Sequence, residues 1–218
     1  MKRNREWHPG TREARWIEGL TMPLLPALEA IEEAAAPGRI PIVDRDSGRV
    51  LAALAAGRRR IVEVGTAYGF STLWMALGQP ADGTIVTIDP DRERTDLARG
   101  WWREAGIADE RITVVNAKAL DAFAAADPAL AGPFDLAFID ALKTEYQAYF
   151  DALFARLAPG ALVVADNVLW SGRVTDAAIT DPDTTALRSF DAVVLGDPRF
   201  TATILPIGDG LLLAGLRG

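Results

Sequence analysis

Cysteine is absent from this chain of 218 residues, and histidine occurs once, at His8. The first absence excludes disulfides, thiolate metal sites and cysteine nucleophiles. The second disfavours Ser-His-Asp catalysis and any metal site built from several histidines. Any chemistry that the chain performs must therefore rest on other side chains.

Long hydrophobic runs and an excess of positive charge are also lacking. No stretch approaches the roughly 20 apolar residues of a membrane span, and residues 1–8 do not precede the apolar run of a signal peptide. Asp and Glu total 30 against 23 Lys and Arg, a net charge of −7. That balance argues against nucleic acid as the main partner. We expect a cytoplasmic protein without membrane association.

From residue 61 onward, short apolar runs alternate with segments of helical character. Such a pattern is typical of a parallel sheet covered on both faces. The turn at residues 208–210 predicts a hairpin between the last two strands. We therefore predict an α/β, Rossmann-like fold, with a seven-stranded, mostly parallel sheet, an antiparallel last strand and helices on both faces. The predicted strands cover residues 61–64, 84–88, 112–115, 136–139, 161–165, 201–205 and 211–216, and the helices between them residues 70–77, 92–104, 119–126 and 145–157.

The chain length suits one large α/β domain, predicted here to cover residues 1–218. Residues 1–57 form its N-terminal helical segment, with a helix over residues 47–56, and residues 58–218 form its Rossmann-like core. The basic cluster at residues 58–60 is interpreted as a solvated helix end.

The first predicted strand contains Glu63 and runs into a turn that contains Gly65 and Gly69. Glycine allows a tight turn and a close approach to a ligand, and open α/β sheets bind ligands beyond the carboxyl ends of their strands. The spacing differs from the G-x-G-x-x-G that binds a pyrophosphate, and a carboxylate suits a cationic ligand. Asp89, which follows the second strand, is placed to accept both hydroxyls of a ribose. These features predict a nucleoside-bearing cofactor, and by themselves they also fit an NAD enzyme.

Three side chains with oxygen ligands follow the fourth and fifth strands: Asp140, Asp166 and Asn167. If these strands are neighbours, the side chains converge at one edge of the sheet. Two carboxylates and an amide suit Mg²⁺, Mn²⁺ or Ca²⁺ better than zinc. A cation there would lower the pKa of a bound hydroxyl, and Lys143 is placed to take its proton. A metal-and-lysine site beside the Gly65 turn favours S-adenosylmethionine as the cofactor.

Taken together, these motifs resemble the cation-dependent O-methyltransferases, a family that includes catechol O-methyltransferase and caffeoyl-CoA O-methyltransferase. The resemblance runs from about residue 42 to the end of the chain. The matching blocks are residues 43–48, 63–71, 88–89, 139–146, 166–170 and 206–210.

The resemblance implies a role for each matched residue. The methionine part of S-adenosylmethionine would be held by Val43, Glu63, Gly65, Thr66 and Ser71. The ribose and adenine would lie against Asp89, Lys118 and Ala119. The metal ligands would be Asp140, which also touches the cofactor, Asp166 and Asn167. The catalytic base would be Lys143, and the acceptor pocket would be lined by Trp170.

Two departures from the family pattern concern the two ends of the site. Leu142 stands where many members have an acidic residue, and the run at residues 117–119 lacks the usual side-chain acceptor for the adenine amine. The segment before Gly38, with Trp7, Trp16 and Met22, is where the family tends to place acceptor-pocket and dimer contacts, so a homodimer is expected.

The leading hypothesis is a divalent-cation-dependent O-methyltransferase that acts on the vicinal hydroxyls of a small aromatic. The alternatives are a methyltransferase for a hydroxylated tRNA base, a non-catalytic module that binds S-adenosylmethionine, and an NAD-dependent dehydrogenase. The acidic composition disfavours the tRNA substrate. The metal-and-lysine set disfavours a non-catalytic module, and the absence of a pyrophosphate loop disfavours the dehydrogenase.

Overall fold

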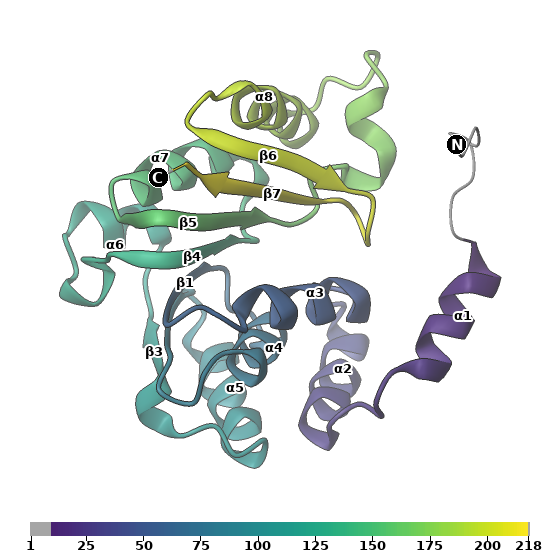
Figure 1. The fold of residues 1–218 in the computed structure, drawn as a ribbon, viewed down its shortest axis with the longest axis vertical. Helices are drawn as coiled ribbons and strands as arrows, with labels where there is room; N and C mark the ends of the chain where they lie inside the picture. The colour runs from purple at the N-terminus through teal and green to yellow at the C-terminus, as the bar shows by residue number, and fades with distance from the viewer. Residues whose placement is uncertain (1–9, 218) are drawn as a thin grey trace.

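One seven-stranded sheet organises the protein (Figure 1), whose computed structural model describes residues 10–217. Trp7 and His8 lie outside this range. The strand order is β3-β2-β1-β4-β5-β7-β6. Only β7 runs against its neighbours, pairing antiparallel with β5 and β6. The predicted fold class is therefore confirmed. The strands are β1 (Arg60–Val64), β2 (Thr84–Ile88), β3 (Ile112–Val115), β4 (Phe134–Ile139), β5 (Leu157–Ala165), β6 (Phe200–Leu205) and β7 (Leu211–Leu216).

Helices cover both faces of the sheet, and each face has its own hydrophobic core. The first core lies under α6 (Ala119–Ala124), α7 (Tyr146–Phe154) and α8 (Pro182–Gly196). The second lies under α2 (Pro26–Gly38), α3 (Arg45–Ala55), α4 (Phe70–Gly78) and α5 (Arg92–Glu104). Because both faces are covered, the central strands are apolar along almost their whole length. Within residues 10–217, no helix combines the length and apolar character needed to cross a bilayer.

The largest differences from the sequence-based expectation concern α7, β5 and α8. The helix predicted over residues 145–157 ends at Phe154, and β5 already begins at Leu157. Its end is fixed by Arg156, whose guanidinium donates to the carbonyl oxygens of Leu130 and Phe123 and so holds the chain against neighbouring loops. Helix α8 was not predicted, although Leu187, Phe190 and Val194 repeat at helical spacing and are buried.

The basic cluster at residues 58–60 was interpreted as a solvated helix end; Arg59 and Arg60 are indeed exposed, but the cluster also stabilises the amino edge of the sheet. The backbone amides of Arg59 and Arg60 donate to the carboxylate of Asp135 at 2.7 and 3.1 Å. The guanidinium of Arg58 donates to the carbonyl oxygens of Asp135 and Gly160 at 3.1 and 3.2 Å. The cluster thus ties the start of β1 to Asp135 of β4 and Gly160 of β5.

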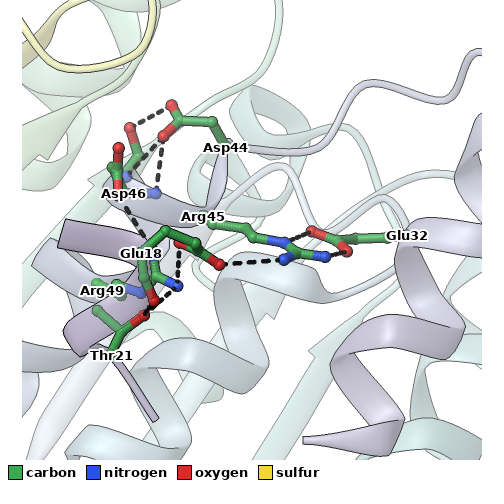
Figure 2. A network of polar contacts seen from close by, with 8 residues as sticks. Glu18, Thr21, Glu32, Asp44, Arg45, Asp46 and Arg49 are labelled. Carbon is green, nitrogen blue, oxygen red and sulfur yellow. Dashed lines mark hydrogen bonds and ion pairs between the residues drawn. The ribbon is translucent and has the colours of Figure 1, made fainter. Parts of the chain in front are cut away.

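Helix α1 (Thr11–Leu20) has no buried residue and is bound to the rest of the protein through polar contacts. The carboxylate of Glu18 lies 3.4 Å from Arg45 and 2.8 Å from Arg49, both on α3. Arg45 also donates two hydrogen bonds, of 2.8 and 2.6 Å, to Glu32 on α2. Figure 2 shows this network, in which Arg45 lies between Glu18 and Glu32. The start of α3 matters for the site, because Val43 and Asp44 immediately precede this helix.

Candidate active site

The turn after β1 lies against the carboxyl ends of both neighbouring strands, β2 and β4. The amide of Gly65 donates to the carbonyl oxygen of Ile88 at 2.9 Å, and its φ is +98°. A Cβ at this position would lie 2.8 Å from the carbonyl carbon of Asp140 and closer still to its oxygen. Only glycine fits, because both the positive φ and the neighbouring backbone exclude a side chain. The ends of β1, β2 and β4 therefore meet at Gly65.

Glu63 is completely buried behind this turn. Its carboxylate accepts hydrogen bonds from the hydroxyls of Ser71 and Thr87, each at 2.6 Å, and from that of Thr72. Burial raises the pKa of Glu63 to about 7, although these hydroxyls oppose the shift. Glu63 does not line the cavity described below, whereas Ser71 does. The contact of Glu63 with a cofactor stays a prediction, and in the structure its carboxylate fixes the start of α4.

Asp89, at the end of β2, also holds the turn in place. One carboxylate oxygen accepts from the amides of Thr66 and Ala67 at 3.1 and 2.8 Å, and the other accepts from the amide of Asp91 at 2.8 Å. The side chain is 9% exposed and faces the cavity. Asp89 thus fixes the conformation of the turn and lies at the position predicted for ribose binding.

A cavity of about 600 Å³ lies at the carboxyl edge of the sheet. This is within the size range of small-molecule sites. Eleven of the residues predicted to form the site line it: Val43, Gly65, Thr66, Ser71, Asp89, Lys118, Ala119, Asp140, Lys143, Asn167 and Trp170. The two that do not are Glu63 and Asp166. The cavity also has charged and aromatic lining residues that the motifs did not predict, namely Arg94, Glu145, Tyr149 and Asp183.

The ammonium group of Lys143 lies among the oxygens predicted to bind a metal. Its Nζ donates to Oδ1 of Asp140 at 2.8 Å, to Oδ1 of Asn167 at 2.7 Å and to the hydroxyl of Tyr146 at 2.7 Å. The residues meet because β4 and β5 are neighbours, with Ile139 opposite Ala165. Lys143 is only 9% exposed.

Asp166 lies beside this group and is 2% exposed. Its Oδ2 accepts a 3.3 Å hydrogen bond from the side chain of Asn167, but its buried Oδ1 has no partner. Burial, reinforced by the charge of Asp140, raises the pKa of Asp166 to about 7. An unpartnered buried acceptor calls for an explanation, and an additional cation beside it would supply one.

The donor set fits a hard cation that retains water ligands. Within residues 10–217, no three His, Cys, Asp or Glu side chains group together as a metal site. The set here has two carboxylates and the amide of Asn167, which such a grouping does not include. Carboxylate and amide oxygens with open positions suit Mg²⁺ or Ca²⁺. Asp140 and Asn167 already direct oxygens at one cation, the ammonium of Lys143.

A sequence model of the O-methyltransferase family matches residues 26–216. The chain belongs to this family. It is 38% identical over 203 residues to a catechol O-methyltransferase of Mycobacterium tuberculosis, with 89% of each chain covered. It is 35% identical over 198 residues to a catechol O-methyltransferase of Niastella koreensis, with 88% of each covered. The O-methyltransferase TomG from Streptomyces achromogenes, solved in complex with SAM, has 32% identity and a TM-score of 0.84, with 100% of each chain covered. The present chain is therefore a SAM-dependent O-methyltransferase.

In this O-methyltransferase, the part of the cavity beyond Lys143 is aromatic and acidic. The Nζ of Lys143 lies 5.7 Å from the centroid of the Trp170 ring. Tyr149 donates a 2.6 Å hydrogen bond to Glu145, and burial raises the pKa of this phenol. Asp183, in the first turn of α8, lines the same cavity. This part of the cavity wall thus presents a flat ring and two carboxylates.

Proposed function

We propose that the enzyme transfers the methyl group of S-adenosylmethionine to one hydroxyl of a catechol-like small aromatic, with a divalent cation bound by Asp140, Asp166 and Asn167. The observation that supports this most directly is the convergence of the Asp140 and Asn167 oxygens on one cationic group at the cavity wall. The names of the two catechol O-methyltransferase relatives agree with a diol acceptor.

The methyl donor would occupy the part of the cavity around the Gly65 turn. Thr66 and Ser71 would bind its methionine end, and Asp89 its ribose, while Lys118 and Ala119 would lie along the adenine. This orientation would direct the sulfonium methyl toward Lys143 and Trp170. Holding the two reactants in line can supply a large part of the rate enhancement in such a transfer.

The acceptor would lie against Trp170. Its hydroxyls would meet the side-chain oxygens of Asp140, Asp166 and Asn167, called here the oxygen set. When bound there, a divalent cation supplies positive charge that lowers the pKa of a hydroxyl. Lys143 would take the hydroxyl proton, and the resulting oxygen anion forms a bond to the methyl carbon as the bond from carbon to sulfur breaks. The products are the methyl ether, S-adenosylhomocysteine and a proton on Lys143.

The test is methyl transfer to a panel of catechols, measured by mass spectrometry with Mg²⁺, with EDTA, and with Mg²⁺ restored after EDTA. We expect activity that EDTA abolishes and Mg²⁺ restores. Asp166→Asn should lose most of this activity. Asp96→Asn, which makes the same chemical change on the exposed surface of α5, should not. Activity that persists in EDTA would refute the metal site, and transfer to bulk tRNA but to no catechol would refute the acceptor.

We also propose that the enzyme forms a homodimer through its N-terminal helix. Trp16, Leu20 and Met22 are 68%, 67% and 86% exposed, an unusual concentration of apolar surface on one short segment. Sedimentation should show a dimer, and Trp16→Glu should weaken it. A monomer at micromolar concentration would contradict this assembly.

A further inference from the structure

The ammonium group of Lys143 has no free hydrogen-bond donor. An ammonium has three N–H groups, and here they meet three acceptors, on Asp140, Asn167 and Tyr146, all within 2.8 Å. In the arrangement observed, Lys143 therefore occupies the oxygens of Asp140 and Asn167 as a bound cation.

Two of these acceptors are the oxygens assigned above to the divalent cation. Each of these oxygens has two lone pairs, so a metal about 2.1 Å from each would share them with the ammonium, which lies 2.7–2.8 Å from both. Two cations on shared ligands also repel each other strongly in a buried site. Binding of a divalent cation therefore opposes the present position of Lys143.

From this geometry we infer that Lys143 is an internal cation that occupies the oxygen set until a divalent cation displaces it, and that Tyr146 is the positioning residue that retains Lys143 afterwards. This inference rests on the metal site proposed above. Binding of the divalent cation would release Lys143 from Asp140 and Asn167. It would leave the hydrogen bond from Lys143 to Tyr146 in place. Lys143 would then stay beside the bound cation, held by Tyr146 alone.

Tyr146 is suited to this role because it is itself held rigidly. Its side chain is 0% exposed, and its hydroxyl donates a 3.0 Å hydrogen bond to the carbonyl oxygen of Asp166. The ring packs edge-on against Phe190 with centroids 5.5 Å apart. The hydroxyl therefore presents its lone pairs to Lys143 from a fixed point that does not belong to the oxygen set.

The first experiment measures Mn²⁺ binding by electron paramagnetic resonance in the full chain. We expect Lys143→Met to bind Mn²⁺ about tenfold more tightly than the wild type, equivalent to ~1.4 kcal/mol, because the competing cation is gone. Lys143→Gln is a second, neutral polar variant that should show the same direction. Lys118→Met removes the other cavity-lining lysine, which has no contact with the oxygen set, and should leave the affinity unchanged within about twofold.

The second experiment follows the displacement itself. Lysine occurs only three times in the chain, as Lys2, Lys118 and Lys143, so amine labelling can be read residue by residue by mass spectrometry. Saturating Mg²⁺ should raise the labelling rate of Lys143 several-fold relative to Lys118.

The role of Tyr146 is tested by Tyr146→Phe, which should lower kcat at least tenfold with the KM for S-adenosylmethionine unchanged. Tyr149→Phe, a matched loss of one hydroxyl, should affect kcat less.

The outcomes separate the two proposals. If the wild type binds Mn²⁺ but Lys143→Met and Lys143→Gln bind it no more tightly, the displacement is refuted and the proposed function stands. If Mg²⁺ leaves the labelling of Lys143 unchanged, the displacement is likewise refuted. If no variant binds Mn²⁺ at all, the metal site of the proposed function fails, and this inference fails with it.

Discussion

Replacing Gly65 by alanine should damage both stability and cofactor binding, for two reasons that can be measured separately. The backbone has a φ of +98° at this residue, which costs an alanine about 1 kcal/mol. The new Cβ would also lie 2.8 Å from the carbonyl carbon of Asp140, so β1 and β4 would have to move apart. Overpacking of this kind costs a further 1–3 kcal/mol or so. We expect a total loss of about 2–4 kcal/mol in the free energy of unfolding.

The control is Gly106→Ala, because Gly106 has a similar φ of +79° and no atom within 4 Å of its added Cβ. It should lose only about 1 kcal/mol. Urea unfolding gives the two free energies, and calorimetry gives the affinity for S-adenosylhomocysteine, which should fall at least tenfold for Gly65→Ala alone. The reasoning is refuted if both variants are destabilised equally and Gly65→Ala retains the wild-type affinity.

Three further predictions concern charges outside the oxygen set. Burial raises the pKa of Asp191 to about 7, so the folded state favours its protonated form, and the wild type should lose stability as pH rises from about 4 to about 7. Asp191→Asn should therefore raise the free energy of unfolding above that of the wild type by ~1 kcal/mol more at pH 8 than at pH 5, as measured by urea unfolding. The gain is small because this side chain is partly exposed. Glu145→Gln with Asp183→Asn should lower kcat/KM for an amine-bearing catechol roughly three- to tenfold relative to a carboxylate-bearing one, since these two carboxylates line the acceptor end of the cavity; an unchanged ratio would contradict their placement. Glu18→Gln should cost less than ~1 kcal/mol of unfolding free energy, because its ion pairs are exposed, and a larger loss would mean that α1 belongs to the core.

Periodic apolar runs predicted the sheet well, because a strand covered on both faces must be apolar along its length. The predicted bounds of β2 (Thr84–Ile88) and β7 (Leu211–Leu216) match those observed. The early start of β5 was missed because Leu157 also continues the helical spacing of α7, and because the bonds of Arg156 that end the helix are tertiary contacts. Local patterns carry no information about such contacts.

For the site, the sequence could place residues at strand ends but could not show which way they turn. Adjacent strands brought Asp140 and Asn167 together as expected. Glu63, by contrast, faces Ser71 and Thr72 and not the cavity, which depends on how α4 packs. Asp183 reaches the cavity from α8, far along the chain from the strand ends, and no local motif marks it.

The arginine cluster at the amino edge of the sheet has a practical consequence. It lies at the opposite end of β1 from the Gly65 turn, and none of its members lines the cavity. Gly57, next to it, is exposed, and an added Cβ there meets no atom within 4 Å. Because the chain has no cysteine, Gly57→Cys would provide a single thiol for attachment to a solid support. The enzyme would then be immobilised in one orientation, with its cavity directed away from the surface.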